Sequence, residues 1–207
     1  MSAQIRILTV DDMPVYREGL GMIIATQPDM LNVAQASDSA EAIEEFRRHQ
    51  PDVTLMERRL PSRSGIETMS TIRGEFPKAK IIMLASFDGD IEIQHALRAG
   101  ALAYVLKSIE KKELLDIIRK VYSGRKCIPA NIATKLAEHL GHENLTVREL
   151  DVLRLICNGL RNKQIAGDLG ISETTVSFHI KNVVDKLQAN DRTHAVTIAL
   201  RRGLLHV

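Results

Sequence analysis

The chain has 207 residues, 44% of them hydrophobic, which is enough for two small domains and excludes a disordered polymer. It has no apolar run of 18 residues, no signal-peptide pattern and no paired cysteines, so we expect a cytoplasmic protein without a membrane partner. The net charge is +2. Nine basic and seven acidic residues lie from His142 onward and 19 of each precede them, so the whole surplus lies in the last third of the chain. This surplus fits either a polyanion partner or an ordinary solvated surface.

The first 123 residues alternate between short apolar runs and segments with helical spacing. The apolar runs, rich in β-branched residues, are Ile5–Val10, Leu31–Ala36, Val53–Met56, Lys80–Leu84 and Leu102–Leu106. The helical segments are Tyr16–Thr26, Ala40–His49 (after Ser39), Gly65–Gly74, Ile91–Ala99 and Glu110–Tyr122. Five such alternations predict an α/β domain with a five-stranded parallel sheet, doubly wound by helices on both faces.

Polar residues follow several of the predicted strands. Asp11 and Asp12 follow the first, Glu57 the third and Lys107 the fifth, while Ala85 ends the fourth. The carboxyl ends of parallel strands meet at one edge of the sheet, where such folds place their working site. We therefore expect these five positions to lie close together.

Residues 124–143 form a predicted linker with its own short helix, Ala130–His139. From residue 144 to 207 the pattern is all helical. Thr146 and Glu149 have the spacing of a capping box, and the helix that they begin is expected to run to about Asn158. Two further helices, Asn162–Leu169 and Glu173–Leu187, flank a turn at residues 170–172, and a fourth helix follows. Two short helices joined by a glycine-containing turn are typical of a helix-turn-helix.

The helix after this turn divides into two faces at about 100° per residue. The predicted apolar back consists of Val176, Ile180, Val183 and Leu187. The predicted front consists of Thr174, Phe178, Lys181 and Asp185, with Ser177 beside them. A helix that enters the major groove of DNA needs this division, although an amphipathic surface helix also shows it.

Several runs in the second half resemble the LuxR-type helix-turn-helix. They are Leu145–Glu149, Asn162–Ala166, Ile171–Val176 with His179, Lys186-Leu187 and Asp191-Arg192. The first half resembles a response-regulator receiver in Asp11-Asp12 with Pro14, Arg17–Leu20, Pro61 with Gly65, Ala99–Ala101, and Tyr104 with Lys107. The whole chain is thus similar to the NarL/FixJ family of two-component response regulators. The resemblance implies a flavodoxin-like receiver over residues 1–123 and a four-helix DNA-binding domain over 144–207.

The resemblance also implies a partner, double-stranded promoter DNA, and a set of contact residues. These are Lys163, Thr174, Thr175, Ser177, Phe178, His179 and Lys181. Ser177 departs from the family, where Lys is usual, so recognition should depend more on Thr174, Phe178 and Lys181. A homodimer is expected on two-fold DNA sites. The apolar residues that follow Asp191 could form a dimer helix or a lid on the domain's own core: Ala195, Val196, Ile198, Ala199 and Leu200.

In the family, an Asp after the third strand accepts a phosphoryl group and a Thr or Ser after the fourth strand reports it. Asp11, Asp12, Tyr104 and Lys107 match the family, but Glu57 stands at the acceptor position and Ala85 at the reporter position. The intervals support this assignment, with 45 residues from Asp12 to Glu57, 28 from there to Ala85, and 22 more to Lys107. We therefore expect a degenerate site in which Glu57 forms a salt bridge with Lys107.

These observations favour a sequence-specific transcription regulator controlled independently of phosphorylation, whose receiver dimerises or senses a ligand. We expect no enzyme activity and no required cofactor, beyond weak Mg²⁺ binding at Asp12 and Glu57, and we regard a histidine kinase partner as doubtful. The alternative is a conventional phosphorylation-switched regulator that uses Glu57 or a neighbouring Asp. A regulator gated by an autoinducer and an enzyme of phosphoryl transfer are both disfavoured, the first by few aromatic residues and the second by little catalytic machinery.

Overall fold

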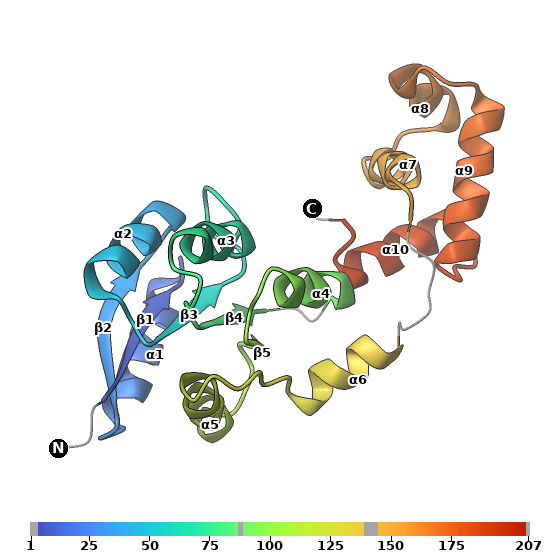
Figure 1. Ribbon diagram of the computed structural model, residues 1–207. Helices are drawn as coiled ribbons and strands as arrows, with labels where there is room; N and C mark the ends of the chain where they lie inside the picture. Colours follow the sequence, from blue (N-terminus) through green and yellow to red (C-terminus); the bar gives the residue numbers. More distant parts are fainter. Residues whose placement is uncertain (1–3, 87–88, 139–144, 206–207) are drawn as a thin grey trace. The chain divides into compact units, whose positions relative to one another are not determined.

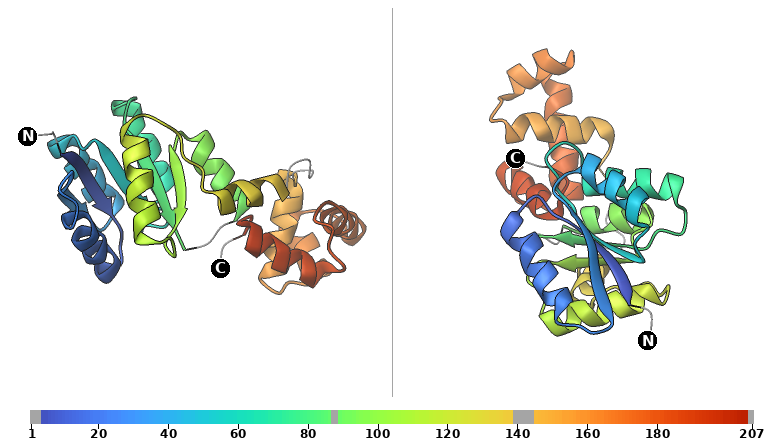
Figure 2. Two further views of the ribbon diagram at one scale, coloured as in Figure 1. Left: turned by 90° about the horizontal axis from the view of Figure 1, so that it is seen from below. Right: turned by 90° about the vertical axis from the view of Figure 1, so that its left-hand side faces the viewer.

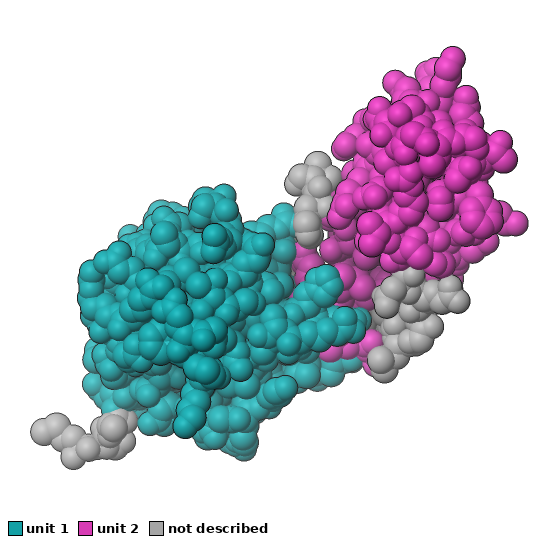
Figure 3. Space-filling view, turned by 45° about the horizontal axis from the view of Figure 1, so that its top comes forward, with its two compact units in different colours: residues 1–88, 93–134 teal, residues 89–92, 135–207 magenta. Residues whose placement is uncertain are grey.

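The computed structural model describes residues 4–86, 89–138 and 145–205. The chain divides into two compact units, which Figure 3 colours separately. The first unit comprises residues 1–88 and 93–134, and the second comprises residues 89–92 and 135–207. Within the described ranges, no helix is both long and apolar enough to cross a lipid bilayer.

The first unit contains a five-stranded sheet in which every neighbouring pair is parallel. Its strands are β1 (Ile5–Val10), β2 (Met30–Ala36), β3 (Val53–Glu57), β4 (Ile81–Ala85) and β5 (Ala103–Leu106). The order across the sheet is β2-β1-β3-β4-β5. This confirms the predicted parallel sheet, and each strand begins and ends within one residue of its predicted bounds.

Helices follow each of the five strands. They are α1 (Pro14–Ala25), α2 (Ser39–His49), α3 (Gly65–Glu75), α4 (Asp90–Arg98) and α5 (Lys111–Tyr122). Apolar side chains of α1 and α5 pack with alternate strand residues into one buried cluster. Helices α2 and α3 contact each other and the sheet on its other face (Figures 1 and 2). The sheet is therefore doubly wound, as predicted.

The start of α2 differs by one residue from the prediction, which placed it at Ala40 after Ser39. Asp38, not Ser39, is the N-cap, because its carboxylate accepts from the backbone N–H groups of Ala40 and Glu41 at 2.8 and 3.0 Å. A carboxylate at this position satisfies amides that have no partner within the helix. Ser39 is instead buried, and its hydroxyl oxygen accepts a hydrogen bond from Thr68 of α3.

The segment after α5 returns to the edge of the sheet. Cys127 forms an isolated parallel bridge with Ala103 of β5, and its backbone N–H donates to the carbonyl oxygen of Leu102 at 2.8 Å. Helix α6 (Ala130–Glu138) then begins where the sequence predicts, while its predicted last residue, His139, lies outside the described residues. The outer edge of β5 is therefore partly occupied by the chain itself.

The second unit contains four helices after residue 145, in agreement with the all-helical prediction. They are α7 (Val147–Cys157), α8 (Asn162–Leu169), α9 (Glu173–Lys186) and α10 (Arg192–Arg202). The predicted capping box is present, with Thr146 and Glu149 each bonding the backbone of the other. Gly170 ends α8 at φ 64°, a left-handed conformation that glycine adopts without strain. Ser172 caps α9 by accepting from the N–H of Thr175.

Two apolar clusters hold these helices together. One joins α7, α8 and the start of α9 through residues such as Val152, Ile165 and Val176. The other joins α7, the end of α9 and α10, and it includes Ala195 and Ala199 as fully buried members. Val196 and Ile198 pack against this core, and Leu200 is exposed. One face of the last helix therefore packs on the domain's own core, and its expected role as a dimer helix stays a prediction.

Candidate functional site

Three of the five predicted positions at the strand ends converge on one ammonium group. The Nζ atom of Lys107 lies 2.7 Å from Asp11 Oδ2 and 2.6 Å from Glu57 Oε2. Asp11 is fully buried and Glu57 is 5% exposed, whereas the Lys107 side chain is 12% exposed. The predicted salt bridge between Glu57 and Lys107 is therefore present, and Asp11 shares the same lysine.

The backbone of neighbouring strands places these side chains. The N–H of Asp11 donates to Ala36 at the end of β2, and the N–H of Lys107 donates to Ala85 at the end of β4. Glu57 is the last residue of β3, and its Oε1 atom accepts from the N–H of Arg59 at 2.8 Å. Hydrogen bonds from the strand ends therefore fix both carboxylates and the lysine at one edge of the sheet.

Gly65, at the start of α3, closes the loop that follows Glu57. Its N–H donates to the carbonyl oxygen of Arg58 at 2.7 Å. A Cβ atom at this position would collide with the carbonyl oxygen of Glu57. Close approach of two backbone segments is a usual reason for glycine. The glycine that the sequence resemblance singled out is thus a requirement of the site's backbone.

Charge balance at the site favours the ionised lysine. Burial lowers the pKa of Lys107, but hydrogen bonds and Coulomb attraction from Asp11 and Glu57 outweigh it, so the pKa is raised above its ordinary value. The ammonium also lies 4.5 Å from the centre of the Tyr16 ring, within the range of a cation–π contact. Burial raises the pKa of the Tyr16 hydroxyl to about 12, against the opposing effect of the Lys107 charge.

The other predicted residues of this site do not join the ion cluster. Asp12 is exposed, and Ala85 is fully buried at the end of β4 without a hydroxyl to offer. Tyr104 is fully buried in β5, in register with Met83. Ser86, one residue beyond Ala85, is exposed. The structure therefore brings together Asp11, Glu57 and Lys107 from the predicted set.

The arrangement is a poor fit to Mg²⁺, which the receiver resemblance implies. Divalent magnesium needs oxygen ligands that are turned toward it. Here Asp11 and Glu57 each direct one oxygen to Lys107, and the other accepts a backbone N–H from Met13 or Arg59. Across residues 4–86, 89–138 and 145–205, no group of three or more His, Cys, Asp or Glu side chains is placed to hold a metal ion.

Two residues of α1 support the site and were not predicted to do so. Tyr16 covers Lys107 with its ring, and Arg17 donates from Nη1 to the carbonyl oxygen of Asp11. Both lie in the first turn of α1, a few residues after Asp11 and Asp12 and just after Pro14. That spacing is the signal in the sequence by which they could have been found.

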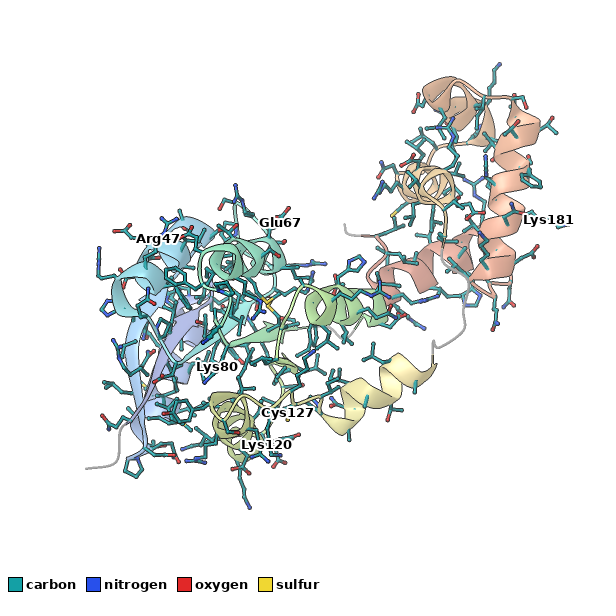
Figure 4. All side chains as sticks on the ribbon, viewed as in Figure 1. Arg47, Glu67, Lys80, Lys120, Cys127 and Lys181 are labelled. Carbon is teal, nitrogen blue, oxygen red and sulfur yellow. The ribbon has the colours of Figure 1, made fainter. Side chains whose placement is uncertain are left out.

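A second candidate site is the front face of α9. Val176, Val183 and Leu187 are buried, and Ile180 packs in the cluster that contains Val176, as the helical spacing predicts. The opposite face is exposed: it consists of Thr174, Ser177, Phe178, Lys181 and Asp185. Phe178 is 60% exposed, which is unusual for a large aromatic side chain. Figure 4 shows Lys181 extending outward from α9.

The remaining predicted contact residues differ in how they are held. Lys163 is exposed on α8. The hydroxyl of Thr175 lies 2.8 Å from that of Ser172, so it takes part in the cap of α9. The ring of His179 meets Phe178 edge-on, with centroids 5.9 Å apart. The hydroxyl of Ser177 accepts from the amide of Asn162 at 3.2 Å.

Comparisons with known proteins agree with the two units. The family profile described as response regulator receiver domain matches residues 7–119, and the one described as bacterial regulatory proteins, luxR family, matches residues 143–199. The transcriptional regulatory protein YxjL of Bacillus subtilis strain 168 is 37% identical over 214 residues, which cover 98% of each chain. The transcriptional regulatory protein LiaR of the same strain is 37% identical over 210 residues, covering 98% of this chain and 100% of LiaR.

A solved complex of the two-component response regulator RcsB with DNA shares the fold. Its TM-score is 0.73 at 23% identity, over 96% of this chain and 98% of RcsB. The receiver match covers more than half of this chain, and the relatives align along nearly all of it. The chain therefore belongs to the response regulators of the NarL/FixJ type, in which a receiver domain precedes a LuxR-family DNA-binding domain.

Proposed function

We propose that this DNA-binding response regulator controls transcription without a phosphorylation switch in its receiver domain. The observation that carries the proposal is the position of Lys107 between two buried carboxylates, one of them at the phosphoacceptor position. The transcriptional regulators that share the family are not enzymes, and neither is this chain. The receiver would then act as a dimerisation or ligand-sensing domain.

The contacts of Glu57 support this proposal. Both of its oxygens are engaged, one by the Arg59 N–H and the other by Lys107, so neither is turned toward an incoming phosphoryl donor. Lys107 would neutralise the phosphoryl group in a conventional receiver, but here it already neutralises Glu57 and Asp11. Ala85 offers no hydroxyl to report a modification. The ion pair of Glu57 and Lys107 would thus be a permanent contact where a conventional receiver has a transient contact between a phosphoryl group and lysine.

A conventional phosphorylation switch is the second candidate, and the exposed Asp12 is the observation that favours it. Incubation of the full chain with acetyl phosphate and Mg²⁺, followed by intact-mass measurement, separates the two. We expect no added mass and no change in DNA affinity. A gain of about 80 Da together with tighter DNA binding would establish the switch instead.

For the DNA-binding domain, we propose that the front of α9 reads promoter DNA in the major groove. The proposed contacts are Lys163, Thr174, Thr175, Ser177, Phe178, His179 and Lys181. Lys181 can bond a guanine edge or a phosphate, and Phe178 can contact a thymine methyl group. Lys181→Ala should lower the salt slope of binding by about one if the contact is to phosphate, or relax one base position if it is to a base. Unchanged affinity in a folded variant would remove Lys181 from the interface.

We further propose a homodimer on DNA, since one helix-turn-helix covers one half-site and two-fold proteins bind two-fold sites. One face of α10 packs on its own core, so a dimer through α10 would use its exposed face, which includes Leu200. Sedimentation of the complex with a two-fold DNA site should give two chains per site. One chain on one half-site at working concentrations would contradict the dimer. The proposal gives a histidine kinase no role and requires no cofactor; the weak Mg²⁺ binding expected at Asp12 and Glu57 is not part of it, because both oxygens of Glu57 are already engaged.

A further inference from the structure

A chain of hydrogen bonds joins three helices of the DNA-binding domain. Arg192, the first residue of α10, donates from Nη1 to Asn162 Oδ1 at 3.1 Å and from Nη2 to the carbonyl oxygen of Leu160 at 2.9 Å. Asn162, the first residue of α8, donates from Nδ2 to Ser177 Oγ at 3.2 Å. Ser177 then donates to the carbonyl oxygen of Glu173 within α9, at 3.0 Å.

The chemistry of these groups allows the chain to run in one direction only. A guanidinium group has donors and no acceptor, so the amide oxygen of Asn162 must face Arg192. The amide nitrogen of Asn162 then faces Ser177. The Ser177 hydroxyl has one proton, which it uses to donate a hydrogen bond to the carbonyl oxygen of Glu173. Each group therefore fixes the orientation of the next, from α10 through α8 to the recognition helix α9.

The chain adds a polar attachment between α8 and α9 at the amino end of α8. At its carboxyl end, α8 connects to α9 through residues 170–172. Between the two helices lies the apolar contact of Ile165 and Ala166 with Val176. The bond from Asn162 to Ser177 lies at the amino end of α8. Two helices that are held at both ends cannot change their crossing angle without breaking one of these attachments.

We propose that Asn162 and Arg192 are positioning residues that set the orientation of α9 for reading base sequence. Ser177 lies on the exposed front of α9, between Thr174 and Lys181, and carries a hydroxyl group instead of a cation. This inference rests on the DNA-binding role proposed for α9, and it assigns Ser177 the anchoring of α9 to Asn162 in place of the direct DNA contact proposed above. Base readout needs side chains placed within a fraction of an ångström, so a small rotation of α9 weakens specific contacts before it affects nonspecific attraction.

The test compares specific with nonspecific DNA binding of the full chain, using a site obtained by in vitro selection. The variants are Asn162→Ala, Ser177→Ala, Arg192→Lys, and Thr197→Ala as a control. Thr197 is exposed on α10, and its hydroxyl bonds only to the backbone of its own helix, at Thr193. Affinities for the selected site and for random DNA are measured at several salt concentrations, with thermal melting as the check of folding.

We expect Asn162→Ala and Ser177→Ala each to lower the ratio of specific to nonspecific affinity by about tenfold, the size of one lost base contact. Melting and salt slope should stay as in the parent, since the bond between Asn162 and Ser177 is exposed and contacts no phosphate. The double variant should lose no more than either single variant, because both remove the same bond. Arg192→Lys, which keeps the charge but loses the planar fork, should lower the ratio in the same direction. Thr197→Ala should change nothing.

Three outcomes would overturn the proposal. A salt slope lowered by about one in Asn162→Ala or Ser177→Ala would mean that the residue contacts phosphate directly. An unchanged affinity ratio in these two variants would mean that the network does not position α9. Losses that multiply in the double variant would mean that the two residues act independently. If Arg192→Lys fails to fold, the pair of Asn162 and Ser177 variants still decides, because the bond that both remove is exposed.

Discussion

Each domain contains a nearly buried glutamate paired with a lysine, and the two pairs are built differently. In the receiver domain, Glu57 and Asp11 share Lys107, so two carboxylates depend on one cation. In the DNA-binding domain, Glu149 Oε2 accepts from both Lys186 Nζ at 2.9 Å and the N–H of Thr146 at 2.8 Å, so one carboxylate has two donors.

The difference shows which residue is the centre of each cluster. Lys107 is the centre in the receiver, since without it two carboxylates would lie together away from water. Glu149 is the centre in the DNA-binding domain, where it forms part of the capping box of α7 and also binds α9 through Lys186. A buried pair is seldom a large net source of stability, but removal of one partner is costly.

The largest effect should come from Lys107→Met. It leaves Asp11 and Glu57 buried without a cation, and we expect a loss of about 3–5 kcal/mol in the free energy of unfolding. Glu57→Gln with Lys107→Met should lose less, because the double change also removes one buried charge. Urea unfolding of the three proteins measures this. Equal losses in the single and double variants would show that Lys107 contributes through packing rather than charge.

A smaller loss is expected from Lys186→Met. Glu149 keeps the N–H of Thr146 and its position at the amino end of α7, where the helix dipole favours a negative charge. We expect a loss of about 1.5–3 kcal/mol, the range for one hydrogen bond to a charged group. Urea unfolding followed by signals from the DNA-binding domain gives the value. A loss as large as that of Lys107→Met would mean that the two clusters depend on their lysines to the same degree.

The two pairs should also respond to opposite changes of pH. Burial raises the pKa of Glu149, but bonds from Thr146 and Lys186 outweigh it, and the pKa lies below its ordinary value of 4.5. Its contribution to stability is therefore present above pH 4.5 and lost as pH falls through the lowered pKa. The pKa of Lys107 is raised above 10.5, so its contribution is present below pH 10.5 and lost as pH rises through the raised pKa.

Melting temperatures measured across pH test this opposition. Glu149→Gln should flatten the acid side of the profile and leave the alkaline side as in the parent. Lys107→Met should flatten the alkaline side, and it should also lessen the loss of stability on the acid side, because protonation then relieves two buried carboxylates that have lost their cation. If Glu149→Gln leaves the acid side as steep as in the parent, other carboxylates control acid stability and the opposition between the domains is not due to these pairs.

The smallest effect is expected from Glu57→Asp. The shorter carboxylate restores an acceptor of the family type, but Ala85 still has no hydroxyl to report a phosphoryl group. DNA affinity should therefore be the same with and without acetyl phosphate. Glu57→Asp with Ala85→Thr should regain a difference. A response of the single variant, measured by the same DNA-binding titration, would show that the hydroxyl is not needed.

Much of the fold could be predicted from local sequence. Apolar runs gave each strand to within one residue, and the caps at Thr146 and Ser172 located α7 and α9. The sequence predicted those residues of the site that stand at strand ends. Asp11, Glu57 and Lys107 converge because the parallel strands end at one edge of the sheet. The one-residue error at α2 arose because two good N-cap residues, Asp38 and Ser39, stand side by side.

Contacts between distant residues could not be predicted in this way. Asn162 and Ser177 are 15 residues apart and Arg192 lies 30 residues from Asn162, so no helical or strand period relates them. The pair of Glu149 and Lys186 spans 37 residues. These contacts depend on how α8, α9 and α10 pack, and a hydrophobic pattern fixes which face is buried but not which polar groups meet at its margin.

Tolerance of substitution around the receiver site should not follow which residues carry its charges. Position 57 can accept Asp or Gln with its backbone unchanged, because only the side chain defines its role. Position 65 carries no side chain at all, yet any replacement would push the start of α3 away from the carbonyl oxygen of Glu57. The most intolerant residue of the site should therefore be Gly65, and sequence variation among functional variants should be narrower there than at the glutamate.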